Sequence, residues 1–296
     1  MSTYVIGDIH GQYSALIDLL LKIKYLPDID TLIFVGDYID WGQDSMKTLL
    51  FLEKLSKNKN VFCLLGNHDH MMLETLNSLK SHTYNKYTQS WLMYNNGSKT
   101  MDSYEKLSKN DQKKIYLFLK NLPLFKDDII INDEKYYISH AYPISHQEIN
   151  NSRLFEKCLW ERYNHFKNPL LEYEQYIDFN FIHGHTPTAS FTGQAIYPYK
   201  QNDIDYSSLK IHKIKYPNNT KCFCIDTGAK FLSDSLQAKL CCIRLEDKKE
   251  FYVNPYKLTK NKNKIDSGIY YYLPKNKLYN DFDESIFLSK NQKSRN

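Results

Sequence analysis

Five short stretches of the chain place Asp, Asn or His directly after an apolar run: GDIHG (7–11), GDYID (36–40), GNHD (66–69), SHA (139–141) and HGHTP (183–187). Carboxylates, amide carbonyls and imidazoles are ligands that suit Mn, Fe or Zn. Two such ions about 3.5 to 4 Å apart would clamp a phosphoryl group and lower the pKa of a bound water. Such a pair needs a shared carboxylate, and Asp37 is the natural bridge. The residue types therefore indicate a dinuclear metal site.

The spacing of the first three motifs is regular. Asp8 and Asp37 are 29 residues apart, and Asp37 and Asn67 are 30 residues apart. These separations are close to one strand-helix-strand repeat of about 30 residues. In open α/β sheets the carboxyl ends of the strands form the ligand crevice. We therefore expect all three side chains on one rim of a sheet.

The elements around these residues alternate along the first 67 positions. Apolar runs at 3–8, 31–37 and 60–67 predict three buried strands, and apolar residues at helical spacing over 12–25 and 45–57 predict the helices between them. This alternation implies parallel strands joined by crossover helices. Both faces of such a sheet should be covered.

The remainder of the chain predicts an insert and a second group of strands. Residues 71–121 have a helical pattern with breaks near 95–98 and 109–111, and Trp91–Tyr94 should face the core. Further on we expect two strands around a turn at Asn132 and Asp133, a helix at 152–163, a strand ending in 181–187, and short strands between 193 and 254. We expect one domain over residues 1–255, with the helical insert at about 71–121, and a basic C-terminal extension over 256–296.

Charge and cysteine usage narrow the class of protein. The formal net charge is +5, and residues 257–296 carry all of that excess, so the body is neutral and a basic nucleic-acid groove is disfavoured. The six cysteines, at 63, 158, 222, 224, 241 and 242, mostly lie in apolar strand-like runs and should be reduced core residues. The sequence shows no signal peptide and no long apolar segment. We therefore expect a cytoplasmic protein without a membrane partner.

The order of the five motifs, followed by IDTGA (225–229), resembles the calcineurin-like metallophosphoesterases. It is most similar to the bacterial branch of the PPP-type serine/threonine protein phosphatases, to which the symmetrical diadenosine tetraphosphatases are closely related. The resemblance runs from Gly7 to about Asp247, with further matches at 90–104, 119–125 and 158–166. It implies an α/β fold in which helices flank a β-sandwich, with a dinuclear site at the carboxyl ends of the strands.

The resemblance also implies a role for each motif residue. Asp8 and His10 would bind one metal, Asn67, His140 and His185 would bind the other, and Asp37 would bridge them. His68 would be the general acid that protonates the leaving oxygen, and Asp40 the carboxylate that orients it. Arg162, in LWERY, would bind the substrate phosphate together with Asn67. We expect Asp69 and His70 to cap or flank the following helix instead of binding metal.

One position departs from the family pattern. The family usually reads GDxxDRG, with an arginine that binds phosphate in a forked geometry, whereas this chain reads GDYIDWG with Trp41. Loss of such a donor costs roughly 2 to 4 kcal/mol of transition-state stabilisation. Trp41 either packs on its neighbours in the loop or stacks on an aromatic part of the substrate, such as phosphotyrosine or a nucleobase.

The function implied by the resemblance is metal-dependent hydrolysis of a phosphomonoester, first of all on a phosphorylated protein, by direct attack of a metal-bound hydroxide. The cofactor would be two divalent metal ions, Mn first, with Fe or Zn as alternatives. A symmetrical dinucleoside tetraphosphate hydrolase, acting on a small phosphoester, would use the same metal ligands. A third possibility is a weakly active or regulatory metal-binding homologue, because of Trp41.

Overall fold

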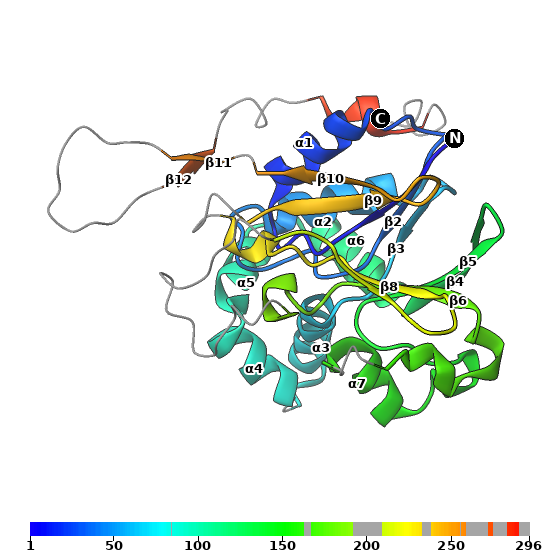
Figure 1. Cartoon of the computed structure of the whole chain (residues 1–296). Helices are drawn as coiled ribbons and strands as arrows, with labels where there is room; N and C mark the ends of the chain where they lie inside the picture. The colour runs from blue at the N-terminus through cyan, green and yellow to red at the C-terminus, as the bar shows by residue number, and fades with distance from the viewer. Residues whose placement is uncertain are drawn as a thin grey trace, which may run out of the picture.

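The computed structural model describes residues 1–83, 85–162, 167–191, 209–232, 238–254, 256–258, 272–274 and 283–289. Two five-stranded β-sheets form its centre, and helices flank them (Figure 1). Parts of the predicted strand region, residues 193–208 and 233–237, lie outside the described residues, as does most of the predicted extension. The predicted class, an α/β sandwich flanked by helices, is confirmed.

The first sheet has the strand order β10-β9-β1-β2-β3. Its strands are β1 (Thr3–Ile6), β2 (Thr31–Phe34), β3 (Val61–Cys63), β9 (Leu240–Arg244) and β10 (Lys249–Val253). Strands β1, β2 and β3 are parallel, and helices α1 (Tyr13–Ile23) and α2 (Ser45–Leu55) connect them. The alternation predicted for the first 67 residues is therefore present.

The second sheet has the strand order β4-β5-β6-β8-β7. Its strands are β4 (Phe125–Ile131), β5 (Glu134–Ser139), β6 (Phe179–His183), β7 (His212–Lys215) and β8 (Lys221–Cys224). Strands β5, β6 and β8 are parallel. Asn132 and Asp133 form the turn between β4 and β5 with φ of 50° and 64°. Asn and Asp tolerate this left-handed conformation better than other side chains, which explains the predicted turn.

Apolar side chains from both sheets fill the space between them. Val5 and Ile33 of the first sheet share one buried cluster with Ile138 and Ile182 of the second. Helices α1 and α2 pack on the outer face of the first sheet, and α7 (Ser152–Trp160) packs on the outer face of the second. The sandwich is thereby closed on both sides, and the parallel strands of each sheet can present their carboxyl ends to a common site.

The predicted helical insert consists of α3 (Asn67–Ser81), α4 (Lys86–Tyr94), α5 (Gly97–Glu105) and α6 (Lys109–Lys120). The break between α4 and α5 lies where it was predicted. The second break falls before residue 109 instead of after it, because the Ser108 side chain accepts a hydrogen bond from the backbone N–H of Asp111 and so begins α6.

The predicted core-facing stretch at the end of α4 is only partly correct. Trp91 is fully buried, but Met93 and Tyr94 are 63% and 70% exposed. These two residues occupy the last turn of α4, where no other described helix covers them. Apolar composition therefore overestimated the core at the end of this helix.

Part of the predicted extension packs on the body. Phe287 and Leu288, at the 3-10 helix Glu284–Phe287, are buried in the cluster formed by α1 and α2, and the Phe287 ring lies 6.3 Å from that of Phe51. Strands β11 (Tyr256–Leu258) and β12 (Tyr272–Pro274) pair with each other. All six cysteines are buried free thiols. Among the described helices, none has the length and apolar character needed to cross a bilayer.

Candidate metal centre

The candidate ligands all follow the carboxyl end of a strand, and all are buried. They are Asp8 and His10 after β1, Asp37 after β2, Asn67 after β3, His140 after β5 and His185 after β6. The segments meet through backbone hydrogen bonds as well as side chains. The N–H groups of Ile9 and His10 both donate to the carbonyl of Asp37, at 3.0 and 2.8 Å. The structure thus brings together, from two sheets, every ligand suggested by the sequence.

The turns that hold these side chains have an unusual backbone. His10, Asp37 and His185 have φ of 49°, 54° and 62°, in the left-handed region that costs roughly 1 to 2 kcal/mol for an L-residue. A Cβ built on Gly184 would lie only 1.9 Å from Oδ1 of Asp8, so only glycine fits beside that carboxylate. Strain of this kind persists where surrounding structure fixes it, and it is common at functional sites.

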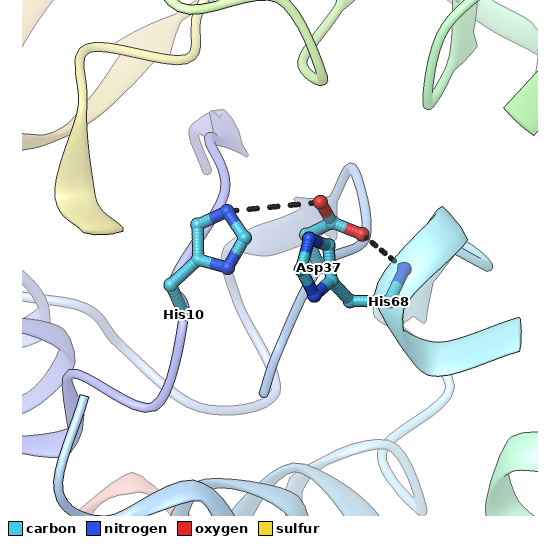
Figure 2. Close-up of side chains that lie close together, drawn as sticks. All are labelled: His10, Asp37 and His68. Atoms are coloured by element: carbon cyan, nitrogen blue, oxygen red, sulfur yellow. Dashed lines mark hydrogen bonds and ion pairs between the residues drawn. The ribbon is translucent and has the colours of Figure 1, made fainter. Parts of the chain in front are cut away.

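One group of potential ligand atoms comes from His10, Asp37 and His68, which lie within 4.8 Å of one another (Figure 2). Nδ1 of His10 lies 3.0 Å from the carbonyl oxygen of Ile39 and must donate to it, because a carbonyl only accepts. Nε2 of His10 therefore carries a lone pair, and it faces Oδ2 of Asp37 at 3.7 Å. The other Asp37 oxygen accepts from the backbone N–H of His68 at 2.9 Å.

A second group of ligand atoms surrounds the other side of Asp37. Nδ1 of His140 lies 2.9 Å from the carbonyl oxygen of Val35, which leaves a lone pair on Nε2, 3.4 Å from Oδ1 of Asp37. His185 places Nε2 3.1 Å from the Trp160 carbonyl oxygen, which leaves its lone pair on Nδ1. Both lone-pair nitrogens lie 2.9 Å from Oδ1 of Asn67, itself an acceptor, and both share a ligand group with Asp37. A cation satisfies such an arrangement, whereas a hydrogen bond between two lone pairs cannot form.

Asp8 supplies a direct test of whether the site fits a cation. Its Oδ2 accepts from the backbone N–H of His185 at 2.9 Å, but its buried Oδ1 has no hydrogen-bond partner in the described part of the chain. Burial and the negative charges of Asp226 and Asp37 raise the pKa of Asp8 well above its ordinary value. A buried, unpaired carboxylate oxygen among other carboxylates is costly without a positive charge.

The histidines are also in the protonation state that a metal requires. Burial lowers the pKa of His10 to about 3, and burial likewise lowers the pKa of His140 and His185. All three are therefore neutral near pH 7, and neutral imidazole is the form that binds metal. Together with the orphaned oxygen of Asp8, these donors fit two divalent cations with Asp37 between them.

Comparison with known proteins agrees with this site. A family model described as calcineurin-like phosphoesterase matches residues 1–219. The chain belongs to the calcineurin-like phosphoesterase family. Members of this family use a dinuclear metal site, and the two candidate ligand groups in this phosphoesterase are consistent with that.

Two kinds of relative are similar to this phosphoesterase in sequence. A symmetrical bis(5'-nucleosyl)-tetraphosphatase from Marinomonas sp. is 36% identical over 132 residues, which cover 45% of this chain and 42% of the relative. Serine/threonine-protein phosphatase 2 from Salmonella typhimurium is 29% identical over 160 residues, which cover 54% of this chain and 67% of the relative. The chain thus spans less than half the length of the first relative.

Solved structures share the fold at low sequence identity. A crystal structure titled as a candidate diadenosine tetraphosphatase has a TM-score of 0.51 at 18% identity, with 85% of this chain and 92% of that chain covered. A hypothetical protein from Pyrococcus horikoshii has a TM-score of 0.51 at 12% identity, with 86% and 87% covered. At these identities the likeness shows the fold alone.

Beside the metal ligands, this phosphoesterase holds His68 and Asp40 in a buried pair, with His68 Nδ1 2.5 Å from Asp40 Oδ2. Burial alone would lower the pKa of His68, but the charge of Asp37 and the charge and hydrogen bond of Asp40 outweigh burial and raise it. The His68 ring also lies edge-on to the His10 ring, with centroids 4.9 Å apart. The first ligand group therefore contains one imidazole of raised pKa, that of His68, next to His10.

Two residues that hold Asp40 were not found by sequence reasoning. The indole Nε1 of Trp91 donates to Asp40 Oδ2 at 2.8 Å, and the hydroxyl of Thr100 donates to Oδ1 at 2.5 Å. Both donors come from the helical insert, 51 and 60 residues after Asp40. Both residues lie in the stretch 90–104 that resembles the family, but the sequence analysis interpreted Trp91 only as a core residue and gave Thr100 no role.

Asp69 contacts the backbone of the turn that carries the candidate ligand Asp37. Its carboxylate accepts from the backbone N–H of Asp37 at 2.7 Å, of Tyr38 at 3.0 Å and of Gly66 at 3.1 Å. Burial and the charge of Asp37 raise the pKa of Asp69 to about 8. Asp69 therefore fixes the turn that carries Asp37, in addition to its place in the first turn of α3.

The remaining candidate residues lie at the rim of the site. Arg162 follows α7 and is exposed, and its charge contributes to the lowered pKa of His185. Trp41 is 38% exposed, and Nζ of Lys230 lies 5.7 Å from the centroid of its ring. Asp226, buried after β8, is a further carboxylate beside Asp8. IDTGA follows an apolar run like the other motifs, so Asp226 could have been found by that signal.

Proposed function

We propose that this phosphoesterase hydrolyses phosphomonoesters on proteins with two divalent metal ions, Mn²⁺ first and Fe or Zn as alternatives. The observation that carries the proposal is the position of Asp37 between two groups of lone-pair nitrogens, on His10 and on His140 with His185. Its six buried free thiols are compatible with action in the reducing cytoplasm.

The contacts support a role for each ligand. Asp8 and His10 would hold the first ion, Asn67, His140 and His185 would hold the second, and Asp37 would be shared. When bound, such ions neutralise the charge of a phosphoryl group and acidify a water molecule beside it. The chain contributes fixed ligand directions, since the carbonyls of Ile39, Val35 and Trp160 set which imidazole nitrogen faces inward.

His68 acts as the general acid. Its pKa is raised, whereas those of His10, His140 and His185 are lowered, so among these four imidazoles it holds a proton most readily. A protonated imidazole is a poor metal ligand, which favours proton transfer to the leaving oxygen over metal binding. Asp40 holds Nδ1 of His68, and Trp91 and Thr100 hold Asp40, so the proton to be donated is aimed by a buried chain of hydrogen bonds.

The rim residues bind the substrate. Arg162 and the amide of Asn67 contact the phosphoryl oxygens, and the exposed part of the Trp41 ring is available to stack on an aromatic group of the substrate. Phosphotyrosine and a nucleobase are the two aromatic groups that fit this role.

A second candidate function is symmetrical hydrolysis of a dinucleoside tetraphosphate. The Marinomonas tetraphosphatase, at 36% identity, supports this candidate, as the Salmonella serine/threonine phosphatase supports the first. Both reactions would use the same ligands. A third candidate, a weakly active metal-binding homologue, follows from Trp41 alone.

The experiment that separates these functions is a substrate panel. The full chain is loaded in turn with Mn, Mg, Fe and Zn, and its metal content is measured. Each form is assayed with phosphoserine and phosphotyrosine peptides, p-nitrophenyl phosphate, its bis ester and diadenosine tetraphosphate. Highest kcat/KM on a phosphopeptide supports the proposal. Preference for the dinucleotide selects the second candidate, and two bound ions without turnover of any substrate select the third.

A further inference from the structure

Lys230 comes from a different part of the fold from the residues it approaches. It lies in the 3-10 helix Ala229–Phe231, shortly after β8 of the second sheet, and its ammonium lies over the ring of Trp41, which follows β2 of the first sheet. Its side chain is partly buried. A cation at 5.7 Å from an indole centroid is within the range of a cation–π contact. The same ammonium lies 4.9 Å from the ring centroid of Phe231, so the two rings together can hold its position.

The charge of Lys230 acts on the centre of the site. It contributes to lowering the pKa of His10, and it opposes the rise in the pKa of His68. In turn, burial lowers the pKa of Lys230, and the negative charges of Asp226, Asp37 and Asp8 oppose that effect. The geometry agrees with these effects, because Trp41, over whose ring the ammonium lies, directly follows Asp40, the carboxylate bonded to the proposed acid His68.

A second cation lies on the same rim. The charge of Arg162 lowers the pKa of Lys230, so the guanidinium and the ammonium repel each other. Asp226 offsets part of the repulsion, but two cations that converge on one rim are most stable when an anion lies between them. A phosphoryl group of the proposed substrate has several anionic oxygens and would contact both, and preorganised positive groups of this kind stabilise developing negative charge.

We propose that Lys230 binds the phosphoryl group of the substrate opposite Arg162, and so supplies at the rim the cation that the Trp41 loop lacks. This inference rests on the proposed phosphoesterase function. Lys230 presents a point charge with three donors, so one non-bridging oxygen can be held without the forked geometry of an arginine. Trp41 then supports the lysine, in addition to any stacking on the substrate.

A purely structural role for Lys230 would be neutralisation of Asp226, four residues earlier, and it makes a different prediction. Loss of the ammonium would then change stability and leave affinity for phosphate as it is. The experiment therefore measures affinity separately from turnover. Lys230→Met removes the charge, Lys230→Arg keeps it, and Lys248→Met is the matched control. Lys248 is also a partly buried lysine over an aromatic ring, that of Tyr136 at 5.0 Å, but it lies at the turn between β9 and β10.

All variants are loaded with Mn, and their metal content and melting temperature are recorded. Calorimetric titration with inorganic phosphate and the kinetics of p-nitrophenyl phosphate hydrolysis are then compared. We expect Lys230→Met to weaken phosphate binding and to lower kcat/KM, each about tenfold to a hundredfold, less than the loss for a fully buried oxyanion donor. Lys230→Arg should stay within about threefold of the wild type, as should Lys248→Met. Unchanged phosphate affinity in a folded Lys230→Met variant overturns the proposal.

A double variant tests where the cation acts. Trp41→Arg introduced into Lys230→Met should restore phosphate affinity and kcat/KM, because the new guanidinium would occupy the same rim. Failure of the proposed function is distinguishable from failure of this inference. If Lys230→Met weakens phosphate binding but the wild type turns over no substrate, only the proposed hydrolase function is disproved. A Lys230→Met variant that keeps the phosphate affinity and turnover of an active wild type disproves only the lysine's role.

Discussion

Nδ1 of His68 lies 2.5 Å from Oδ2 of Asp40, and no other pair of side chains in the described site joins an imidazole of raised pKa to a carboxylate so closely. A hydrogen bond between charged partners is shorter and stronger than a neutral one. It keeps the proton on His68 and fixes the direction of the ring. The proposed acid role depends on both effects.

Replacement of His68 by Asn should lower turnover about hundredfold to ten-thousandfold, the usual contribution of a general acid, while two metal ions stay bound. The loss should be larger for phosphoserine peptide than for p-nitrophenyl phosphate, whose leaving group needs no proton. Kinetics and metal analysis check this. His70→Asn, a buried histidine of the same helix outside the ligand groups, is the control. Loss of metal in the His68 variant would show that His68 is a ligand.

Asp40→Asn should shift the pH dependence of kcat. A general acid works only while protonated, so the rate falls as pH rises through the pKa of His68. Asp40 helps to raise that pKa, so its neutralisation should move the falling limb to lower pH. A pH profile of wild type and variant with the same metal measures the shift. If the falling limb of the profile does not move, His68 and Asp40 do not set the pH dependence of kcat.

Thr100→Val should impair catalysis from outside the ligand set. Loss of its hydrogen bond to buried Asp40 should cost about 1 to 2 kcal/mol, a decrease of roughly fivefold to thirtyfold in kcat. Thr100→Ser keeps the hydroxyl and should keep most of the activity. KM and metal content should not change in either variant. Equal activity of the Val and Ser variants would mean that the hydroxyl does not position Asp40.

The metal-free protein should lose stability between about pH 7 and 8. In the folded state the pKa of Asp69 is about 8 and that of Asp8 is well above ordinary, while in the unfolded chain both are already ionised. A carboxyl group whose pKa is raised in the folded state stabilises the folded protein at low pH. This contribution is lost as the pH rises through the folded-state pKa. His10, His140 and His185 do not contribute in this range, because they are deprotonated in both states, whereas His68, with its raised pKa, adds to the loss.

Urea unfolding at several pH values, with EDTA and with Mn, measures this effect. With Mn bound the carboxylates are paired with cations, so the dependence on pH should be weaker and the protein more stable, by about 2.7 kcal/mol when free metal is a hundredfold above its dissociation constant. If the free energy of unfolding depends on pH equally with EDTA and with Mn, the proposed metal site is wrong.

The positions of the candidate metal ligands could be predicted because their signals are local. Asp8, Asp37 and Asn67 each follow an apolar run, and their spacing of about 30 residues is that of a strand-helix-strand repeat. The contacts of Asp40 with Thr100 and of Lys230 with Trp41 left no such signal, since each joins distant segments whose approach depends on tertiary packing. The exposed end of α4 was mispredicted for the same reason, because periodicity does not show which helix faces have a neighbour.

The hydrogen bond between Asp8 and the backbone N–H of His185 spans 177 residues. During synthesis, the first three motifs leave the ribosome long before the segment that completes the cluster. The early segments therefore carry uncompensated acidic groups until more than half of the polypeptide has emerged. Under the proposed two-metal function, the complete site can bind its cations only after the late segment that carries His185 has folded against the early ones.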